Sequence, residues 1–586
     1  MQAVFREILK NIVLCGGLMG VWTVLIKLSA NTGVNGFSWR LLLITMLVVL
    51  GRYFYRLERL YLKLIGSFTA AALSVLYIGF KAEISMPWGL IADSITFILS
   101  IAAVAATVPN CFNKGYQRIV VAVPLWSIIF LLASMFWLCY LAEGSWLSAN
   151  AILAIMQTNF SESAEYVKIH FSVAGIIGIL VLAGLLGYLA YDVKQNGGLK
   201  ASNGKIKLLL VIFILYNAAT INSTFIKNLW TEPFINAYKS LEEYNNFKAQ
   251  KELRQININP AAITADAENC LYVLAIGESE TRMHMSAYGY AKPTTPWLTE
   301  MVANKEALLF TKAYSNYTHT VQALAYALTA KNQYNDMEVA KAVSLVDVAK
   351  AAGYKVIWLS NQEHYGIYDT PTSVIADAAD QQIFINHTVD GMGRTTDLYD
   401  ESLVKELSRA GIDNKTLLIV HFMGCHGGYN SRYPYDKAVF GSADDVACYD
   451  NAVHYNDWVM ENLYDKLKSV PNFKGLVYFS DHGEAVEEKL GHNSDQFRPV
   501  MAKIPLYMIF SAAYKQEHSD RYQNLLQSVD KTFTNDLIYD TMLGIMGIHY
   551  QDHDEVQNDL TSPYYDSNID RFKTLYGKIN IKDIGE

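Results

Sequence analysis

Cysteine is scarce in this sequence, which excludes the small folds that are held together by disulfide bonds. Six cysteines are scattered over 586 residues, and three of them lie in or beside apolar segments of the N-terminal half. The other three, Cys270, Cys425 and Cys448, form an odd set. At least one of them therefore stays unpaired, even in an oxidising compartment.

Basic residues are outnumbered as well: 48 Lys and Arg stand against 56 Asp and Glu, so the formal net charge is −8. No basic stripe that could neutralise a row of phosphates is present, which excludes nucleic acid as a partner. Internal repeats and low-complexity tracts are also missing. The chain exceeds the usual length of one domain, and its 52% hydrophobic content is typical of a membrane unit joined to a soluble one.

Long apolar runs are confined to the first 230 residues, and seven of them reach the length of about 17 to 25 residues that crosses a bilayer. They lie at residues 12–28, 39–55, 62–80, 89–108, 120–141, 171–191 and 208–225. A core helix of a globular protein could explain one such run, but not seven in succession with short polar connections. Residues 1–230 are therefore predicted to form an all-α polytopic membrane domain.

Basic side chains in three connections indicate the orientation of this domain. The connections after the second, fourth and sixth runs carry Lys and Arg: Arg52, Arg56, Arg59, Lys63, Lys114, Arg118, Lys194, Lys200, Lys205 and Lys207. The positive-inside rule places these connections in the cytoplasm. With an odd number of spans, a polar linker at 231–267 and a soluble domain at 268–586 then lie outside the cytoplasm.

The soluble part alternates apolar, β-rich runs with helical patterns. Strands are expected at 271–276, 355–359, 416–420 and 476–479, and helices at 343–352, 398–410 and 451–468. Strand, helix, strand order implies a mostly parallel sheet that is covered on both faces. The soluble part is therefore predicted to be an α/β domain with a central, mostly parallel sheet.

Two of the expected strands end in residues that can bind a metal. The run 476–479 leads into Asp481, His482 and Gly483, and the run 271–276 leads into Glu278. An Asp-His pair in a turn is by itself more often a hydrogen-bonded loop. Because parallel strands end at the same edge of a sheet, the second strand end favours a shared metal site.

A nucleophile candidate lies in the stretch 317–324, where Thr318 and Thr320 precede a helical pattern. Thr at a helix N-terminus is usually a cap, but a cation and the helix dipole would both stabilise its alkoxide. His426 and His492 follow strand ends, where they could protonate a leaving group or bind phosphate, although each alone is more often structural. Chemistry alone leaves both threonines open.

Taken in order, the motifs of the soluble half resemble those of the membrane-bound phosphoethanolamine transferases of Gram-negative bacteria, members of the alkaline phosphatase and sulfatase superfamily. The matching stretches are residues 277–279, 288–290, 294–296, 318–320, 421–427, 432–434, 449–451, 455 and 480–484. The resemblance implies an alkaline-phosphatase-like, sulfatase-type domain in the periplasm, anchored in the lipids of the inner membrane. It also implies transfer of phosphoethanolamine from phosphatidylethanolamine to lipopolysaccharide, on lipid A or a core sugar.

Carried over to this chain, the resemblance implies four zinc ligands: Glu278, Thr320, Asp481 and His482. Thr320 is then also the nucleophile that carries a covalent intermediate. One tight zinc site is expected, and a second zinc during turnover is left open. His426 and His492 are implied to act in catalysis and to hold the transferred group or that second zinc.

An extracytoplasmic helix near residues 150–166 is also implied, reaching over the active site. Thr158 and Glu162 are four residues apart, so they share one helix face and could contact the phosphoethanolamine head group. The alternative is an interfacial helix with a capping Thr. Ala154 stands where many relatives carry Asn, so the complete set of head-group contacts does not carry over.

Other departures from the family pattern leave the acceptor and the number of spans open. Asn316 and Tyr326 stand where members that modify lipid A have a disulfide beside the nucleophile. Residues 358–362 look like those of members that decorate core sugars. Five spans are usual in the family, against the seven counted above, and both numbers put the enzyme outside the cytoplasm.

Three other classes compete with this interpretation. A phosphoglycerol or other head-group transferase of the lipoteichoic acid synthase type, acting on a periplasmic glycan or surface polymer, would have a similar layout and site. A sulfatase would need a Cys or Ser nucleophile followed by Pro and Arg, which Thr320 does not provide. A non-catalytic membrane sensor would lack metal ligands, and all four are present.

Overall fold

The computed structural model describes residues 74–82, 114–157, 187–195, 228–266, 269–362, 370–386, 398–412, 415–553 and 555–585, together with positions 90, 91, 94, 97, 112 and 184. The chain divides into two compact units. One consists of Met1–Ala154 and Tyr166–Lys239, and the other of Ile155–Glu165 and Ser240–Glu586.

In the described part of the chain, one helix is long and apolar enough to cross a bilayer. This is α5 (Gly115–Glu143), which contains an apolar stretch of 27 residues, Gly115–Leu141. It covers the predicted span at 120–141 and ends at Gly144, whose left-handed φ of 66° is typical of a helix C-terminus. The predicted spans at 12–28, 39–55 and 208–225 lie outside the described residues, and only parts of the remaining three lie inside.

The predicted helix near residues 150–166 is described only at its beginning. There α6 (Ala149–Gln157) starts one residue before the expected position. Thr158 and Glu162 lie outside the described residues. Their proposed contact with the head group therefore stays a prediction.

A seven-stranded sheet forms the centre of the second unit, in the order β3-β9-β8-β2-β7-β5-β6. Its strands are β2 (Cys270–Gly277), β3 (Ala307–Leu309), β5 (Lys355–Ser360), β6 (Gln381–Phe384), β7 (Lys415–His421), β8 (Phe473–Ser480) and β9 (Leu506–Phe510). The four predicted strands lie within β2, β5, β7 and β8, which are parallel to one another. β9 is antiparallel to both of its neighbours, so the sheet is mixed rather than simply parallel.

The direction of β9 follows from the chain that precedes it. Between β8 and β9 the described structure has only two short 3-10 turns, Ser494–Gln496 and Pro499–Met501. A parallel strand needs a crossover that carries the chain back along the sheet, usually through an α-helix. Without that helix the chain returns antiparallel, which the alternation of strands and helices elsewhere in the sequence did not indicate.

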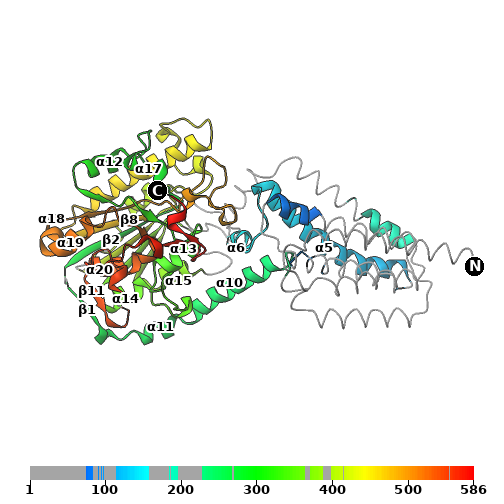
Figure 1. Ribbon diagram of the computed structural model, residues 1–586, viewed down its shortest axis with the longest axis horizontal. Coiled ribbons are helices and arrows are strands. Elements are labelled where there is room, and N and C mark those ends of the chain that lie inside the picture. Colours follow the sequence, from blue (N-terminus) through cyan, green and yellow to red (C-terminus); the bar gives the residue numbers. More distant parts are fainter. Residues whose placement is uncertain are drawn as a thin grey trace, which may run out of the picture. The chain divides into compact units, whose positions relative to one another are not determined.

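Helices cover both faces of this sheet (Figure 1). One layer consists of α12 (Pro296–Ala303), α16 (Glu401–Glu406) and α17 (Asp445–Leu467), and the other of α13 (Thr320–Ala327), α14 (Leu345–Ala351), α15 (Pro371–Ala376) and α20 (Ile538–Met546). Successive side chains of a strand point to opposite faces. Val273 of β2 therefore packs in the first layer and Leu274 in the second, and every position of β2 is buried.

Further helices and three pairs of short strands complete the second unit. The helices are α10 (Glu232–Ala249), α11 (Lys251–Asn257), α18 (Ala512–Glu517) and α19 (Ser519–Leu526), of which α10 starts eight residues before this unit begins at Ser240. The paired strands are β1 (Ile263–Ala265) with β11 (Ile548–Tyr550), β4 (Ala313–Tyr314) with β10 (Phe533–Thr534), and β12 (Lys573–Thr574) with β13 (Ile579–Asn580). Helices α10 and α11 lie within the predicted linker at 231–267.

The register of the central strands decides where the site lies. β2 is between β7 and β8, with Ile276 opposite His421 and Gly277 opposite Ser480. The three strands therefore end at the same level. Residues that follow them emerge side by side at the carboxyl edge of the sheet, where open α/β sheets bind their ligands.

Candidate functional site

The four residues predicted as metal ligands lie together at this edge. Thr320 is the first residue of α13, and its Oγ1 lies 2.9 Å from Glu278 Oε2 and 3.4 Å from His482 Nε2. His482 Nε2 is also 3.4 Å from Glu278 Oε1 and 3.4 Å from Asp481 Oδ2. Two carboxylates, one imidazole and one hydroxyl thus converge on a single point.

The spacing of these atoms fits a tetrahedral zinc ion. With bonds of about 2.0–2.1 Å, the ligand atoms around such an ion are about 3.3 Å apart, close to the distances above. Oδ2 of Asp481 is buried and has no hydrogen-bond partner among the described residues. A buried carboxylate oxygen is costly without a partner. A cation at this point would supply that partner, so the residues present fit the metal.

Electrostatics point the same way. Burial raises the pKa of Asp481, and the negative charge of Glu278 raises it further, to about 8. Burial lowers the pKa of His482, but Asp481 and Glu278 outweigh this effect and raise it to about 10. Burial raises the pKa of Glu278, but His482 and His426 outweigh it and hold that pKa well below its usual range. The Glu278 carboxylate is therefore ionised, and its charge beside the buried Asp481 favours a positive charge between them. The site is therefore built to receive a cation.

The turn that presents Glu278 is unusually tight. Ser279 has a φ of 56°, a left-handed conformation that a residue with a side chain adopts only when its surroundings require it. Its N–H donates to Asp481 Oδ1 at 3.1 Å. Gly424 has a φ of 55°, and a Cβ at this position would lie 2.8 Å from the Glu278 carbonyl oxygen. Glycine at 424 therefore allows the loop after β7 to support the Glu278 backbone.

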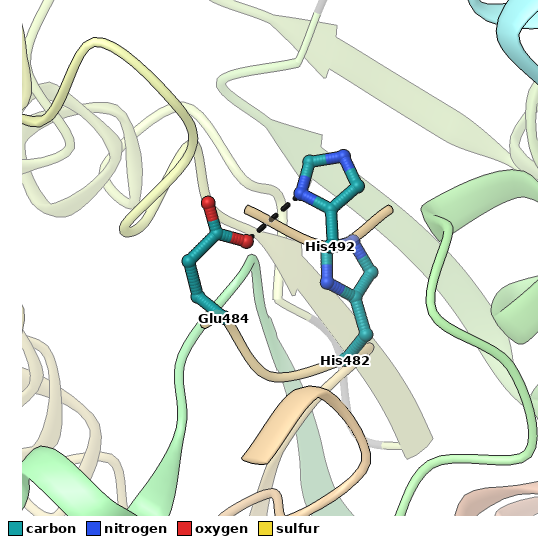
Figure 2. Close-up of side chains that lie close together, drawn as sticks. All are labelled: His482, Glu484 and His492. Atoms are coloured by element: carbon teal, nitrogen blue, oxygen red, sulfur yellow. Dashed lines mark hydrogen bonds and ion pairs between the residues drawn. The ribbon is translucent and has the colours of Figure 1, made fainter. Parts of the chain in front are cut away.

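His492 is held by Glu484, a residue to which the sequence alone assigned no role. Nδ1 of His492 lies 2.8 Å from Glu484 Oε2, a contact that Figure 2 marks with a dashed line. Glu484 Oε1 accepts the Tyr429 hydroxyl at 2.6 Å. Burial raises the pKa of Glu484, but His492 and Tyr429 outweigh it and hold the pKa below its usual range. Because an ionised carboxylate only accepts, Nδ1 of His492 carries a proton, and Nε2 is the atom that can exchange one.

Four histidines gather beside Thr320. The ring centre of His492 lies 4.6 Å from that of His482, 5.3 Å from His319 and 6.4 Å from His426. The structure thus brings together His426 and His492, two of the residues that the sequence singled out. His319 was not singled out there, although its position next to Thr320 was a signal. Burial, helped by His492 and His482, holds the pKa of His319 well below its usual range, so its imidazole is neutral.

Thr318, the other nucleophile candidate, is placed differently from Thr320. Its side chain is fully buried, and its Oγ1 has no hydrogen-bond partner among the described residues. Thr320, in contrast, directs its hydroxyl to Glu278.

Within the described residues, Cys270, Cys425 and Cys448 are all buried free thiols.

An ion-pair clamp joins the two loops that present the metal-ligand candidates. His284 follows β2, and its side chain is 1% exposed; its Nδ1 lies 2.7 Å from Asp450 Oδ1 on α17. Its Nε2 lies 2.8 Å from Oε1 of Glu487, which follows β8. Both ring nitrogens therefore face a carboxylate, the arrangement that favours a doubly protonated imidazolium.

We expect this clamp to lose strength at alkaline pH. Burial lowers the pKa of His284, but Asp450 and Glu487 outweigh it and raise the pKa to about 9. The folded pKa lies above the ordinary value of about 6.5, so the stabilisation is complete below about pH 6.5 and is lost as the pH rises through about 9. The Tm difference between the wild type and His284→Gln should therefore shrink over that range. His518→Gln is the control, because burial and Arg521 lower the pKa of His518; a constant difference for His284→Gln would contradict the expectation.

Comparisons with known proteins place the second unit in a recognised group. Residues 271–548 match the family model described as Sulfatase. Phosphoethanolamine transferase EptC of Escherichia coli K12 is 28% identical over 480 residues, which cover 75% of this chain and 81% of the relative. Phosphoethanolamine transferase EptA of Helicobacter pylori is 26% identical over 485 residues, covering 78% of this chain and 88% of the relative.

Solved structures give a consistent result. The crystal structure of the C-terminal periplasmic domain of E. coli EptC in complex with zinc is 28% identical, with a TM-score of 0.50, and covers 55% of this chain and 96% of that domain. The integral membrane protein EptA of Neisseria meningitidis is 18% identical, with a TM-score of 0.55, and covers 88% of this chain and 97% of that protein. At this identity the second likeness is one of fold alone.

Proposed function

We propose that this protein moves phosphoethanolamine from phosphatidylethanolamine to lipopolysaccharide. The proposal starts from the family to which the chain belongs, the membrane-bound phosphoethanolamine transferases within the alkaline phosphatase superfamily. Members of this family are enzymes, and so is this protein. The main support for this reaction is the 2.9 Å contact between the Thr320 hydroxyl and Glu278, which puts a candidate nucleophile among the candidate metal ligands.

In this proposal four residues hold one zinc ion: Glu278, Thr320, Asp481 and His482. The proposal is supported by their spacing, by the unpartnered Oδ2 of Asp481, and by the zinc complex of the similar E. coli domain. When bound, zinc lowers the pKa of a coordinated hydroxyl and offsets negative charge that develops on the phosphoryl oxygens.

Thr320 acts first, as the nucleophile. With zinc bound, the Thr320 hydroxyl would lose its proton to solvent. A bond then forms between its Oγ1 and the phosphorus of the donor while the bond from phosphorus to the diacylglycerol oxygen breaks, which leaves phosphoethanolamine on Thr320. The N-terminus of α13 favours negative charge at this point, because its amide groups are directed there. In this proposal His426 or His492 protonates the departing diacylglycerol oxygen, which is supported by the 6.4 Å between their ring centres beside the candidate ligands.

A second displacement returns the enzyme to its starting state. A hydroxyl or phosphate oxygen of the acceptor attacks the same phosphorus, and the bond to Thr320 breaks. Where the acceptor is a hydroxyl, Nε2 of His492 takes its proton. Glu484 supports this role, because the contact to Nδ1 selects the tautomer in which Nε2 is basic. The resemblance of residues 358–362 to core-modifying members supports a core sugar as acceptor, with lipid A as the other candidate.

The membrane domain has a physical task in this scheme. Extracting a two-chain lipid into water would cost about 0.8 kcal/mol for each exposed methylene. An enzyme anchored beside the donor avoids that cost. We therefore place residues 1–230 in the inner membrane, with 231–267 as linker and 268–586 in the periplasm. Thr158 and Glu162 are proposed to contact the head group from the membrane side.

Full-length protein in lipid nanodiscs tests the reaction. We expect diacylglycerol release from phosphatidylethanolamine and a phosphoethanolamine mass on added lipopolysaccharide. Fragmentation of the product in the mass spectrometer separates lipid A from core sugars. Phosphatidylglycerol is the matched donor control. Preferential release of diacylglycerol from phosphatidylglycerol would contradict the proposal and favour a phosphoglycerol transferase.

A further inference from the structure

The C-terminal hairpin places three consecutive residues in the left-handed region. Between β12 and β13, Leu575, Tyr576 and Gly577 have φ values of 51°, 54° and 86°. This conformation is unfavourable for residues with a Cβ, and only the third of them is glycine. Strain of this kind persists where surrounding contacts determine the backbone, and it is common beside functional sites.

Tyr576 contacts the segment that carries Thr320 at several points. Its N–H donates to the Asn316 carbonyl at 3.2 Å, and its hydroxyl donates to the Gln322 carbonyl at 2.8 Å. Its ring stacks on Tyr326, with ring centres 4.2 Å apart and an interplanar angle of 18°. The ring of Tyr317 lies 4.6 Å away. One residue thus spans α13 from the approach to its N-terminus to its last turn.

The same contacts reach the loop after β8. Asn316, which accepts from Tyr576, donates its N–H and its Nδ2 to Asn535 Oδ1 at 2.8 and 2.7 Å. Asn535 Nδ2 in turn donates to the Asp481 carbonyl at 2.7 Å. A continuous path of hydrogen bonds therefore joins the hairpin, the nucleophile segment and the backbone of a candidate metal ligand.

We propose that Tyr576 is a positioning residue, which holds the Thr320 hydroxyl at its distance from Glu278 and His482. This inference rests on the proposed function, since the exact place of Thr320 matters most if it is the nucleophile. The helix α13 has only eight residues, and a helix that short depends on its packing for rigidity. Attack on phosphorus is sensitive to placement, because an error of about 1 Å can cost on the order of 10²-fold in rate.

Tyr576→Phe in the full-length protein tests the inference, because it keeps the stacked ring and removes the hydrogen bond to Gln322. We expect kcat for transfer from phosphatidylethanolamine to fall about 5- to 10-fold, with KM changed less than about twofold. Zinc content should not change. Hydrogen exchange of the amides at 320–327 should become faster, which is a readout independent of activity.

Tyr565→Phe is the matched control. The Tyr565 hydroxyl also donates to a backbone carbonyl, that of Thr532, at 2.6 Å, and its ring is buried in the core. Tyr565→Phe should lower the Tm about as much as Tyr576→Phe does, but it should leave kcat and the hydrogen exchange of the amides at 320–327 unchanged. Tyr576→Ala, which also removes the stack, should lose more activity than Tyr576→Phe while still unfolding cooperatively.

The outcomes separate this inference from the proposed function. If Tyr576→Phe matches Tyr565→Phe in kcat and in exchange at 320–327, the positioning role is overturned, although wild-type transfer still supports the function. If the wild type does not transfer phosphoethanolamine, the proposed function fails. Exchange at 320–327 then decides alone whether Tyr576 holds α13 in place.

Discussion

Thr320→Ala should abolish phosphoethanolamine transfer, with a loss on the order of 10⁴-fold or more in kcat. The substitution removes the oxygen that forms the bond to phosphorus in the proposed mechanism. Thr320 Oγ1 is also the hydroxyl that contacts Glu278 and lies beside His482. Transfer from labelled phosphatidylethanolamine measures the loss, and mass spectrometry without acceptor should find the adduct on the wild-type peptide that contains Thr320.

Thr318→Ala provides the control for this variant, since both remove one threonine hydroxyl from the same short segment. Thr318 is fully buried and outside the ligand cluster, so its loss should act through packing and reduce transfer only modestly. Thr320→Ser, which keeps a hydroxyl, should retain part of the activity. An adduct on Thr318, or undiminished turnover in Thr320→Ala, would overturn the assignment of the nucleophile.

Removing Asp481 and His482 together should deprive the protein of its zinc. The double variant Asp481→Ala, His482→Ala loses one carboxylate and the imidazole, which are half of the proposed ligands. Elemental analysis of the purified full-length protein should find about one tightly held zinc per wild-type chain and almost none in the double variant. Full retention of zinc in this variant would refute the site.

Two further variants separate loss of metal from loss of structure. Asp481→Asn keeps an oxygen that can accept the Ser279 N–H, so it should fold and bind zinc more weakly. Asp457→Asn changes a buried carboxylate that accepts the N–H groups of Trp297 and Leu298 at 2.8 and 3.1 Å. It should destabilise the domain and leave the zinc content unchanged, because α12 lies outside the ligand cluster.

Local patterns in the sequence predicted the central strands and grouped the candidate ligands at the ends of those strands. A strand that is buried on both faces must be apolar at every position, so the run 271–276 could be identified as a strand and lies within β2. Parallel neighbours end at one edge, which is why Glu278 could be expected to lie beside Asp481 and His482, although it precedes them by about 200 residues in the sequence. The predicted spans outside the described residues stay predictions.

Contacts between distant segments decided how the side chains of the candidate site are oriented and paired. The choice between Thr318 and Thr320 depends on which side chain α13 turns toward Glu278, and no local pattern contains that information. The pairing of Glu484 with His492 depends on how the loop after β8 folds back on itself.

The contact between Tyr576 and α13 could not be predicted from local patterns either, because the two are far apart in the sequence. It meets α13 only because a hairpin more than two hundred residues later in the chain, with an unfavourable backbone, closes against it. The sequence by itself thus determined the apolar runs of the first 230 residues, the central strands and the chemical groups at the ends of those strands. The orientation of those groups was left to tertiary packing, because side-chain direction is set by neighbours that come from far along the chain.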